Sequence, residues 1–367
     1  MKIAYLALGE EWQNNSAGHS HSFSICQNLA KLGNDVELFI RGKGKPQAFG
    51  RLKVSFINLP KAGGRISGLK ELRKLSEKLK NFEIIQERFS VNPLSVLARF
   101  GFKGKTILEV NDPGVETWTG LRKIAYAPLI RLKLESCDAI ITQTETIKKI
   151  LKAQTKKPVF VISNAAAVKK ASKRALEKAR KEMKCKNGVV CAIFAGSFRE
   201  WHGVRLIPKI SRLVSGKKIR IVLIGNGELF EKVKSECKSI GNVRFLGAKP
   251  FEKIPELLQA ADILIAPFVW NNKKFDFWWN PLKLFEYLAA GKPIVTTGFK
   301  EVRKIAKNAA LYAKPEDIKE FARLLEKLAK NKNLRQRLGK KALQIARENT
   351  WEKKASETLK IYKKVLA

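Results

Sequence analysis

Residues 280–297 read NPLKLFEYLAAGKPIVTT, and this stretch decides the fold of the 367-residue chain. Asn280 is a favourable N-cap residue, and Pro281 suits the first turn of a helix. Gly291 and Pro293 end that helix before the strand-like run IVTT. The stretch therefore predicts a short helix, delimited at both ends, that leads directly into a β-strand.

The N-terminus of this predicted helix is suited to binding an anion. Its backbone N–H groups and the positive end of its dipole favour a diphosphate, and Lys283 adds a full positive charge close by. Glu286 lies one turn further on the same face, where a carboxylate can accept hydrogen bonds from two neighbouring sugar hydroxyls. The pattern indicates a nucleotide site; the alternative is an ordinary Lys–Glu pair on a helix surface.

Strand-length apolar runs alternate with helix-length segments on both sides of this stretch. The second half contains VVCAIFAG, RIVLIG, VRFLG, DILIAPF and PIVTTG, and the first half contains KIAYLAL, VELFI, KVSFI, FEIIQ, TILEV, AIITQ and VFVIS. Such alternation is typical of parallel βα units and predicts an α/β protein with two parallel sheets. The predicted domains are residues 1–168 and 188–345, joined by a polar linker over 169–187. A C-terminal helix, 346–367, is expected to return to the first domain.

Composition narrows the class of protein. Lys and Arg number 73 against 33 Asp and Glu, a formal charge of +40, which indicates either a polyanionic partner or a diffuse basic surface. The five cysteines are scattered and form no CxxC pair, so neither a disulfide framework nor a zinc site is expected. No run approaches the ~20 apolar residues of a spanning helix, and the first apolar run is too short for a signal peptide. We expect a cytoplasmic protein whose membrane contact, if any, is peripheral, at the inner membrane face.

Other glycine-containing turns follow predicted strands. Gly18 lies after the first strand of the chain, and FAGSFREWHGV and RIVLIGNGE follow strands of the second half. Anions commonly bind at such strand ends, next to helix N-termini. The candidate residues in the second half are Gly196, Ser197, Arg199, His202, Gly225 and Gly227. An NAD site is disfavoured, because the third position of a dinucleotide fingerprint is the bulky Phe230.

These residues resemble a known family. NPLKLFEYLAAGKP is very similar to SPLKLFEYLAAGKP, a donor-site signature of the family 4-like, or group 1, retaining glycosyltransferases. GSFREWHGV, VLIGNGE, VRFLG, AADILIAPF and NTWEKKASETLKIY resemble other parts of their second domain and terminal helices. QERFS, TILEVNDPGVE, ESCDAIITQTETIKKIL and VISNAAAV resemble their first domain. The resemblance covers nearly all of the chain and implies the GT-B fold, in which two Rossmann-like domains with parallel sheets face each other across a cleft.

The resemblance also implies how a nucleotide-diphosphate-sugar donor would be bound. Glu286 would hold the ribose of the donor. Lys283 and the amides near Pro281 and Leu282 would contact donor phosphate or sugar. Gly18 would let the first domain approach the diphosphate.

The chain departs from the family pattern at three positions. The first glutamate of the family's E-x7-E pair falls at Trp278, and the arginine and lysine for the leaving diphosphate fall at Ser197 and His202. Neutralisation of the diphosphate would then depend on Arg199, Lys283 and a protonated His202.

The implied mechanism is a retaining transfer in which the departing phosphate oxygen assists the acceptor hydroxyl, so that the protein stabilises charge rather than supplying a nucleophile. No metal or other cofactor is expected, because the nucleotide-sugar is a substrate and no DxD-like pair follows a strand. Polar residues near strand ends of the first domain are the acceptor-side candidates: His19, His21, Glu109, Asn111, Asp112 and Glu116.

The acceptor is unknown, and a glycan or a lipid-linked saccharide would suit the family. The segment RISGLKELRKLSEKLK, residues 65–80, predicts a basic amphipathic helix that could contact an anionic membrane; the alternative is an ordinary outer helix. Two other functions stay open. One is a GT-B nucleotide-sugar epimerase, and the other is a non-enzymatic basic protein that binds nucleic acid, for which no recognition motif is present.

Overall fold

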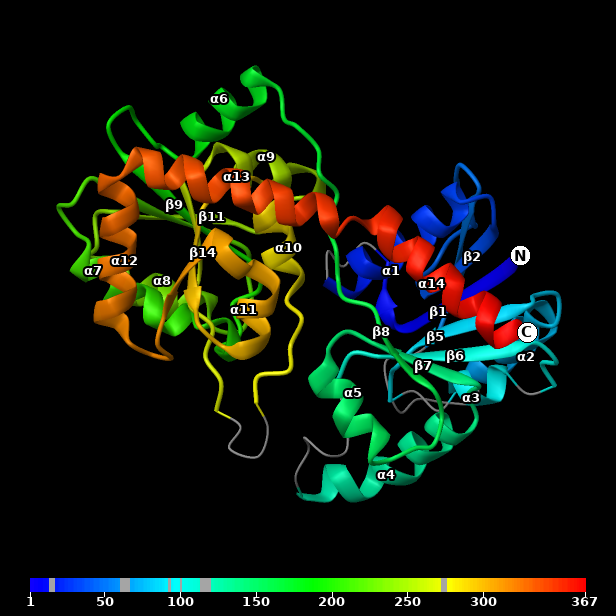
Figure 1. Cartoon of the computed structure of the whole chain (residues 1–367). Helices are drawn as coiled ribbons and strands as arrows, with labels where there is room; N and C mark the ends of the chain where they lie inside the picture. Colours follow the sequence, from blue (N-terminus) through cyan, green and yellow to red (C-terminus); the bar gives the residue numbers. More distant parts are fainter. Residues whose placement is uncertain (13–16, 60–66, 92–93, 100, 113–119, 272–275) are drawn as a thin grey trace. The chain divides into compact units, whose positions relative to one another are not determined.

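The computed structural model describes residues 1–12, 17–59, 67–91, 94–99, 101–112, 120–271 and 276–367. The chain divides into two compact units (Figure 1). Unit 1 comprises Met1–Asn164 together with Trp351–Ala367, and unit 2 comprises Ala165–Thr350. The chain therefore changes unit after residues 164 and 350, whereas the sequence predicted boundaries at 168, 187 and 345.

Unit 1 is built on an eight-stranded sheet with the order β3-β4-β2-β1-β5-β6-β7-β8. Neighbouring strands pair in parallel, except that β3 and β4 are antiparallel. The strands are β1 (Lys2–Glu11), β2 (Asp35–Arg41), β3 (Gln47–Phe49), β4 (Leu52–Ile57), β5 (Ile84–Arg88), β6 (Lys105–Val110), β7 (Ala139–Thr142) and β8 (Val159–Val161). The apolar run of β1 lies at the centre, fully buried from Ile3 to Ala7, as expected of a parallel strand that is covered on both faces.

The helices of unit 1 are α1 (Ala17–Lys31), α2 (Ser67–Leu79), α3 (Leu94–Ala98), α4 (Gly120–Glu135), α5 (Glu145–Lys152) and α14 (Trp351–Leu366). Helix α14 ends the chain and packs against α1. It is therefore part of unit 1, although α13, which precedes it, belongs to unit 2.

Helix α2 bears on the segment predicted to contact a membrane. Its side chains Leu72, Leu75 and Leu79 are at most 4% exposed and belong to the core of unit 1. These three are not available to insert into a bilayer, which favours the alternative of an ordinary outer helix; residues 65 and 66 lie outside the described residues, and membrane contact of the segment 65–80 stays a prediction. Within the described parts of the chain, no helix combines the length and the apolar character needed to cross a membrane.

Unit 2 is built on a six-stranded parallel sheet with the order β11-β10-β9-β12-β13-β14. Numbered within the unit, this is the Rossmann order 3-2-1-4-5-6. The strands are β9 (Val190–Ala195), β10 (Ile219–Ile224), β11 (Val243–Gly247), β12 (Ile263–Ala266), β13 (Ile294–Thr297) and β14 (Ala310–Ala313). The chain order reverses between β9 and β12, and ligands of open α/β sheets bind outside the carboxyl ends of the strands at such a point.

The α-helices of unit 2 are α6 (Lys173–Glu182), α7 (Ile207–Leu213), α8 (Phe230–Glu236), α9 (Ile254–Ala260), α10 (Leu282–Ala289), α11 (Lys300–Ala306), α12 (Ile318–Lys330) and α13 (Lys332–Glu348). The 3-10 turns are η2 (Glu200–His202), η3 (Val204–Leu206), η4 (Phe251–Lys253) and η5 (Lys307–Ala309). The segment predicted as a linker contains α6, which packs against α9 and places Ala179 and Met183 in the core.

Helix α10 is the one predicted from the opening stretch, with its start displaced by one residue. The N-cap position is taken by Pro281, which is extended, rather than by Asn280, and no side chain caps the helix. At the other end Gly291 has a φ of +67°, the left-handed conformation that commonly ends a helix.

Candidate functional site

The loops after β9 and β10 of unit 2 lie against each other at the reversal point of the sheet. The Phe198 amide donates to the Asn226 carbonyl at 3.0 Å, which joins the two loops. Gly225 has a φ of +129°, and a Cβ there would overlap the carbonyl of Gly196. Two predicted glycine turns therefore form one surface, and their close approach requires glycine.

Lys283 of α10 points toward this surface. Its side chain is largely buried, 7% exposed, and its Nζ lies 4.2 Å from the ring centre of Phe194 and 5.6 Å from that of Phe268. A Cβ on Gly196 would be 2.5 Å from Nζ. The ammonium has no hydrogen-bond partner among the described residues. Burial without a partner lowers the pKa of Lys283 from 10.5 to about 7.

Glu286 lies one turn after Lys283 on α10 and is half-buried. Burial raises the pKa of its carboxyl from 4.5 to about 7, and Lys283 opposes this shift. The neighbouring Tyr287 fixes the helix in place. Its hydroxyl accepts from the Ala195 amide at 2.9 Å and donates to the Ile265 carbonyl at 3.2 Å. Tyr287 thus ties α10 to β9 and β12, the two strands that flank the reversal point.

His202 lies beside this group but does not carry the predicted positive charge. Its Nδ1 donates to the backbone carbonyl of Ser197. Burial, together with the charge of Lys283, lowers the pKa of His202 well below 6.5, so the imidazole is neutral at pH 7. Arg199 is exposed in the same loop. Lys283 and Arg199, not His202, are therefore the cations available on this loop and helix.

Aromatic rings form one side of the site. The ring centre of Trp201 lies 3.8 Å from that of His202. Trp201 also stacks on Trp279, with ring centres 4.9 Å apart and planes 8° from parallel. Trp278, where the resembled family has a glutamate, is 3% exposed and meets Trp270 edge to face at 4.4 Å. Five of the aromatic residues at this site were not predicted from the sequence: Phe194, Trp201, Phe268, Trp279 and Tyr287. The density of aromatic residues in 268–279 was the signal available for part of this set.

The other donor-side residues of unit 2 surround this group. Ser197 is half-buried and its hydroxyl is 3.1 Å from Nδ1 of His202. A Cβ on Gly227 would lie 2.7 Å from the Phe198 amide. Asn280 and Pro281 are buried and Leu282 is half-buried, directly before Lys283. The candidate site of unit 2 therefore consists of the β9 and β10 loops and the start of α10.

Gly18 belongs to unit 1, at the start of α1. A Cβ on Gly18 would overlap the carboxylate of Glu10, which also lies 3.4 Å from Nε of Arg88. The close approach that this glycine permits is thus to a carboxylate of the same unit. A carboxylate near a helix N-terminus is favourable for the same electrostatic reason as a phosphate.

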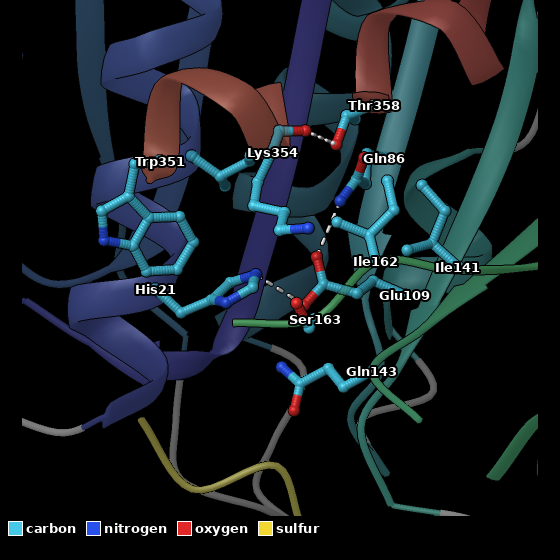
Figure 2. A pocket seen from close by; sticks show the side chains of 11 residues that line it. His21, Gln86, Glu109, Ile141, Gln143, Ile162, Ser163, Trp351, Lys354 and Thr358 are labelled. Carbon is cyan, nitrogen blue, oxygen red and sulfur yellow. Dashed lines mark hydrogen bonds and ion pairs between the residues drawn. The ribbon is translucent and has the colours of Figure 1, made fainter. Parts of the chain in front are cut away.

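Glu109 of β6 is the centre of a buried polar network in unit 1 (Figure 2). Its carboxylate interacts with five side chains at 2.7–3.0 Å: Tyr5, His21, Gln86, Arg88 and Asn111. Burial opposes ionisation, but His21 and Arg88 hold the pKa of Glu109 well below its ordinary value. A carboxylate engaged in this way positions its neighbours and has no lone pair left to accept the proton of a sugar hydroxyl.

His21 is held in the same network. Its Nδ1 lies 2.7 Å from Oδ1 of Asn164, and its Nε2 is 3.0 Å from Glu109. Figure 2 shows the indole of Trp351, from α14, on one side of the His21 ring and the Glu109 carboxylate on the other. The cavity beside them has a volume of about 10 Å³. That volume suits a single water molecule and not a sugar.

The remaining acceptor-side candidates are dispersed. His19 is half-buried with its ring 4.9 Å from that of Trp12, and Asp112 is half-buried after β6. Glu116 lies outside the described residues. Among those that are described, no three His, Cys, Asp or Glu side chains are grouped so as to hold a metal ion.

Two family models match the chain. Glycosyltransferase Family 4 matches residues 19–169, and Glycosyl transferases group 1 matches residues 177–345. An uncharacterized glycosyltransferase, MJ1069, of Methanocaldococcus jannaschii is 24% identical over 310 residues, which is 78% of this chain and 76% of that protein.

Solved structures share the fold over the whole chain. Sucrose-phosphate synthase from Thermosynechococcus elongatus superposes with a TM-score of 0.79 at 15% identity, covering 100% of this chain and 99% of that one. Anabaena HepE, solved with UDP and glucose, gives 0.76 at 15% identity over 98% and 99% of the two chains. WaaG, a glycosyltransferase involved in lipopolysaccharide biosynthesis, gives 0.74 at 14% identity over 98% and 99%.

Proposed function

Because the chain belongs to the group 1 glycosyltransferases and has the GT-B fold, we propose that it transfers a sugar from a nucleotide-diphosphate-sugar to an acceptor hydroxyl with retention. The observation that carries the proposal is the buried ammonium of Lys283, which has no hydrogen-bond partner among the described residues and lies beside the glycine turn at Gly196. A buried cation without a partner is costly, so its presence points to an anionic ligand that completes the site.

The donor diphosphate is the ligand that fits this arrangement. Its oxygens would accept hydrogen bonds from Lys283 and from backbone amides at the start of α10, where the helix dipole adds positive potential. The absence of a Cβ at Gly196 leaves room beside Nζ for a phosphate oxygen. The solved HepE complex with UDP-glucose is consistent with such a donor in this family.

Glu286 is proposed to bind the ribose of the donor. A carboxylate one turn behind the phosphate site can accept hydrogen bonds from both hydroxyls of a pentose. Charge-assisted hydrogen bonds from the hydroxyls favour the ionised carboxylate, so a ligand with both hydroxyls binds more tightly.

During transfer, the protein stabilises the negative charge that develops on the leaving diphosphate. Lys283 and the N-terminus of α10 supply that stabilisation in a partly water-excluded site, and Arg199 adds a second, exposed cation. In neutral His202, Nδ1–H donates to the Ser197 carbonyl, so Nε2 is free of a proton and can accept a hydrogen bond from a hydroxyl of the nucleotide-sugar. We propose that these groups act without a metal ion; activity that persists in excess EDTA would support this.

The acceptor is proposed to be a glycan or a lipid-linked saccharide, in line with the involvement of WaaG in lipopolysaccharide biosynthesis. Cytoplasmic location stays a prediction from the five scattered cysteines, and contact with an anionic membrane surface stays a prediction from the charge of +40.

The proposal is tested by thermal shift and calorimetry with UDP-, GDP-, ADP- and dTDP-sugars. One of them should stabilise the protein, by about 2.7 kcal/mol at a concentration 100 times its Kd. Glu286→Ala should weaken that binding at least tenfold and abolish transfer, whereas Glu231→Ala, at a side chain that is 82% exposed, should change neither. If no nucleotide-sugar binds, the proposal fails, and if a bound donor is converted without an acceptor, the enzyme is an epimerase instead.

A further inference from the structure

Lys283 and Glu286 can carry opposite charges. The surroundings of Lys283 disfavour its positive charge, and those of Glu286 disfavour its negative charge. Lys283 is enclosed by the rings of Phe194 and Phe268 and has no hydrogen-bond partner among the described residues. In the part of the chain that the structure describes, Glu286 is the one carboxylate whose charge acts on Lys283. A buried ionisable group without a close partner tends to lose its charge, because its hydration is not replaced.

The other titratable groups around the pair do not supply the missing partner. His202, from η2, is itself neutral. Besides burial, the charges of Lys283 and of Arg199 in the preceding loop lower its pKa. Tyr287, next to Glu286, keeps its proton because burial raises the pKa of its phenol. Among the described residues, the groups that lie against Nζ are therefore two ring faces and the backbone of a glycine.

We propose that nucleotide-sugar binding converts this pair to its charged form, Lys283 as an ammonium on the diphosphate and Glu286 as a carboxylate on the ribose, and thereby exchanges protons with the solvent. This inference rests on the proposed function. The physical reason is that each group gains its natural partner only when the ligand arrives. Without such partners, burial brings the pKa of both groups to about 7.

Ligand binding takes up protons on one side of pH 7 and releases protons on the other. Above pH 7 the empty site holds Lys283 mainly as a neutral amine, so binding takes up a proton. Below pH 7 it holds Glu286 mainly as a neutral acid, so binding releases a proton. Affinity is therefore highest near pH 7. Linkage makes Kd about threefold weaker one pH unit to either side and about 25-fold weaker two units away.

The experiment is calorimetric titration with whichever UDP-, GDP-, ADP- or dTDP-sugar the wild-type protein binds, at pH 6, 7 and 8. Each titration is repeated in buffers of different ionisation enthalpy, which gives the number of protons exchanged. We expect a net release of up to one proton at pH 6, a net uptake of up to one proton at pH 8 and a smaller net exchange near pH 7. A proton count that stays near zero at all three values overturns the inference and leaves the proposed function intact. Failure of every nucleotide-sugar to bind overturns the proposed function itself.

Two variants show which residue exchanges the proton at pH 6 and which exchanges it at pH 8. Lys283→Arg keeps a cation whose charge does not depend on pH in this range, so proton uptake at pH 8 should vanish while release at pH 6 persists. Glu286→Gln should remove the release at pH 6 and keep the uptake at pH 8. Uptake at pH 8 that survives in Lys283→Arg would assign the proton to another group and refute the role given to Lys283. The wild-type titration decides the proposal even where a variant does not fold.

Discussion

Replacing Lys283 with methionine should stabilise the protein while abolishing nucleotide-sugar binding. The lysine is 7% exposed, lies over two phenylalanine rings and has no hydrogen-bond partner among the described residues. Methionine has a similar length and no charge, and its thioether contacts aromatic rings favourably. Residues kept for function against the interest of stability are expected in binding sites.

The size of the effect follows from the pKa of Lys283. The value falls from 10.5 in the unfolded chain to about 7 in the folded protein. A difference of that size corresponds to roughly 4–5 kcal/mol at 1.36 kcal/mol per pKa unit. Because the folded pKa is the lower one, folding releases a proton between pH 7 and 10.5. The penalty is complete below pH 7, shrinks as the pH rises and is absent above about 10.5.

Urea unfolding of unit 2 at pH 7 and at pH 9.5 measures this directly. At pH 7 the Lys283→Met variant should be more stable than wild type by about 2–4 kcal/mol, which allows for imperfect packing of the new side chain. At pH 9.5 most of the difference should be lost. Lys340→Met, at an exposed lysine of α13, is the matched control and should change stability little at either pH. A Lys283→Met variant that is less stable than wild type at pH 7 would refute the account of an uncompensated charge.

Three further predictions concern folding stability, each measured by urea unfolding. Glu109→Gln removes the charge that pairs with buried cations and should cost about 3–5 kcal/mol of stability at pH 7. The stabilising contribution of Glu109 is lost as the pH falls below 4.5. The control Glu135→Gln, at an exposed ion pair, should cost less than ~1 kcal/mol. Gly203→Ala places a Cβ on a backbone carbonyl and should cost several kcal/mol, whereas Gly216→Ala, also at positive φ but with nothing within 4 Å, should cost only about 1 kcal/mol; equal losses would contradict the contact argument. Tyr287→Phe leaves the Ala195 amide unpaired and should cost about 1–3 kcal/mol, and an unchanged midpoint would show that water replaces the hydroxyl.

Several features of the chain were predictable because they depend on neighbours in sequence. Continuous apolar runs such as that of β1 identified buried parallel strands, and the stretch 280–297 identified α10 and β13. The left-handed Gly291 at the end of α10 is a local backbone requirement of the same kind. The choice of Asn280 as N-cap missed by one residue, because a helix start depends on which backbone groups tertiary contacts leave to be capped.

The protonation of site residues was not predictable from local pattern. His202 was expected to be charged, and Glu109 was expected to face an acceptor. The first is neutral because it is buried and because the charge of Lys283, 81 positions away, lowers its pKa further, and the second is engaged by side chains from three other segments, β1, α1 and β5. Likewise, residues 65–80 have the spacing of an amphipathic helix, but only the packed core shows that Leu72, Leu75 and Leu79 are already covered.

The amino-acid sequence by itself thus determined the order of strands and helices, the position of the α10 helix and the type of ligand that its N-terminus favours, since all of these follow from short-range periodicity and backbone chemistry. Only the tertiary structure decided which charges survive burial. The free energy of an ionised side chain depends on groups within a few ångströms in space, and in this protein Phe194 and Gly196 from one segment and Phe268 from another approach Lys283 of α10.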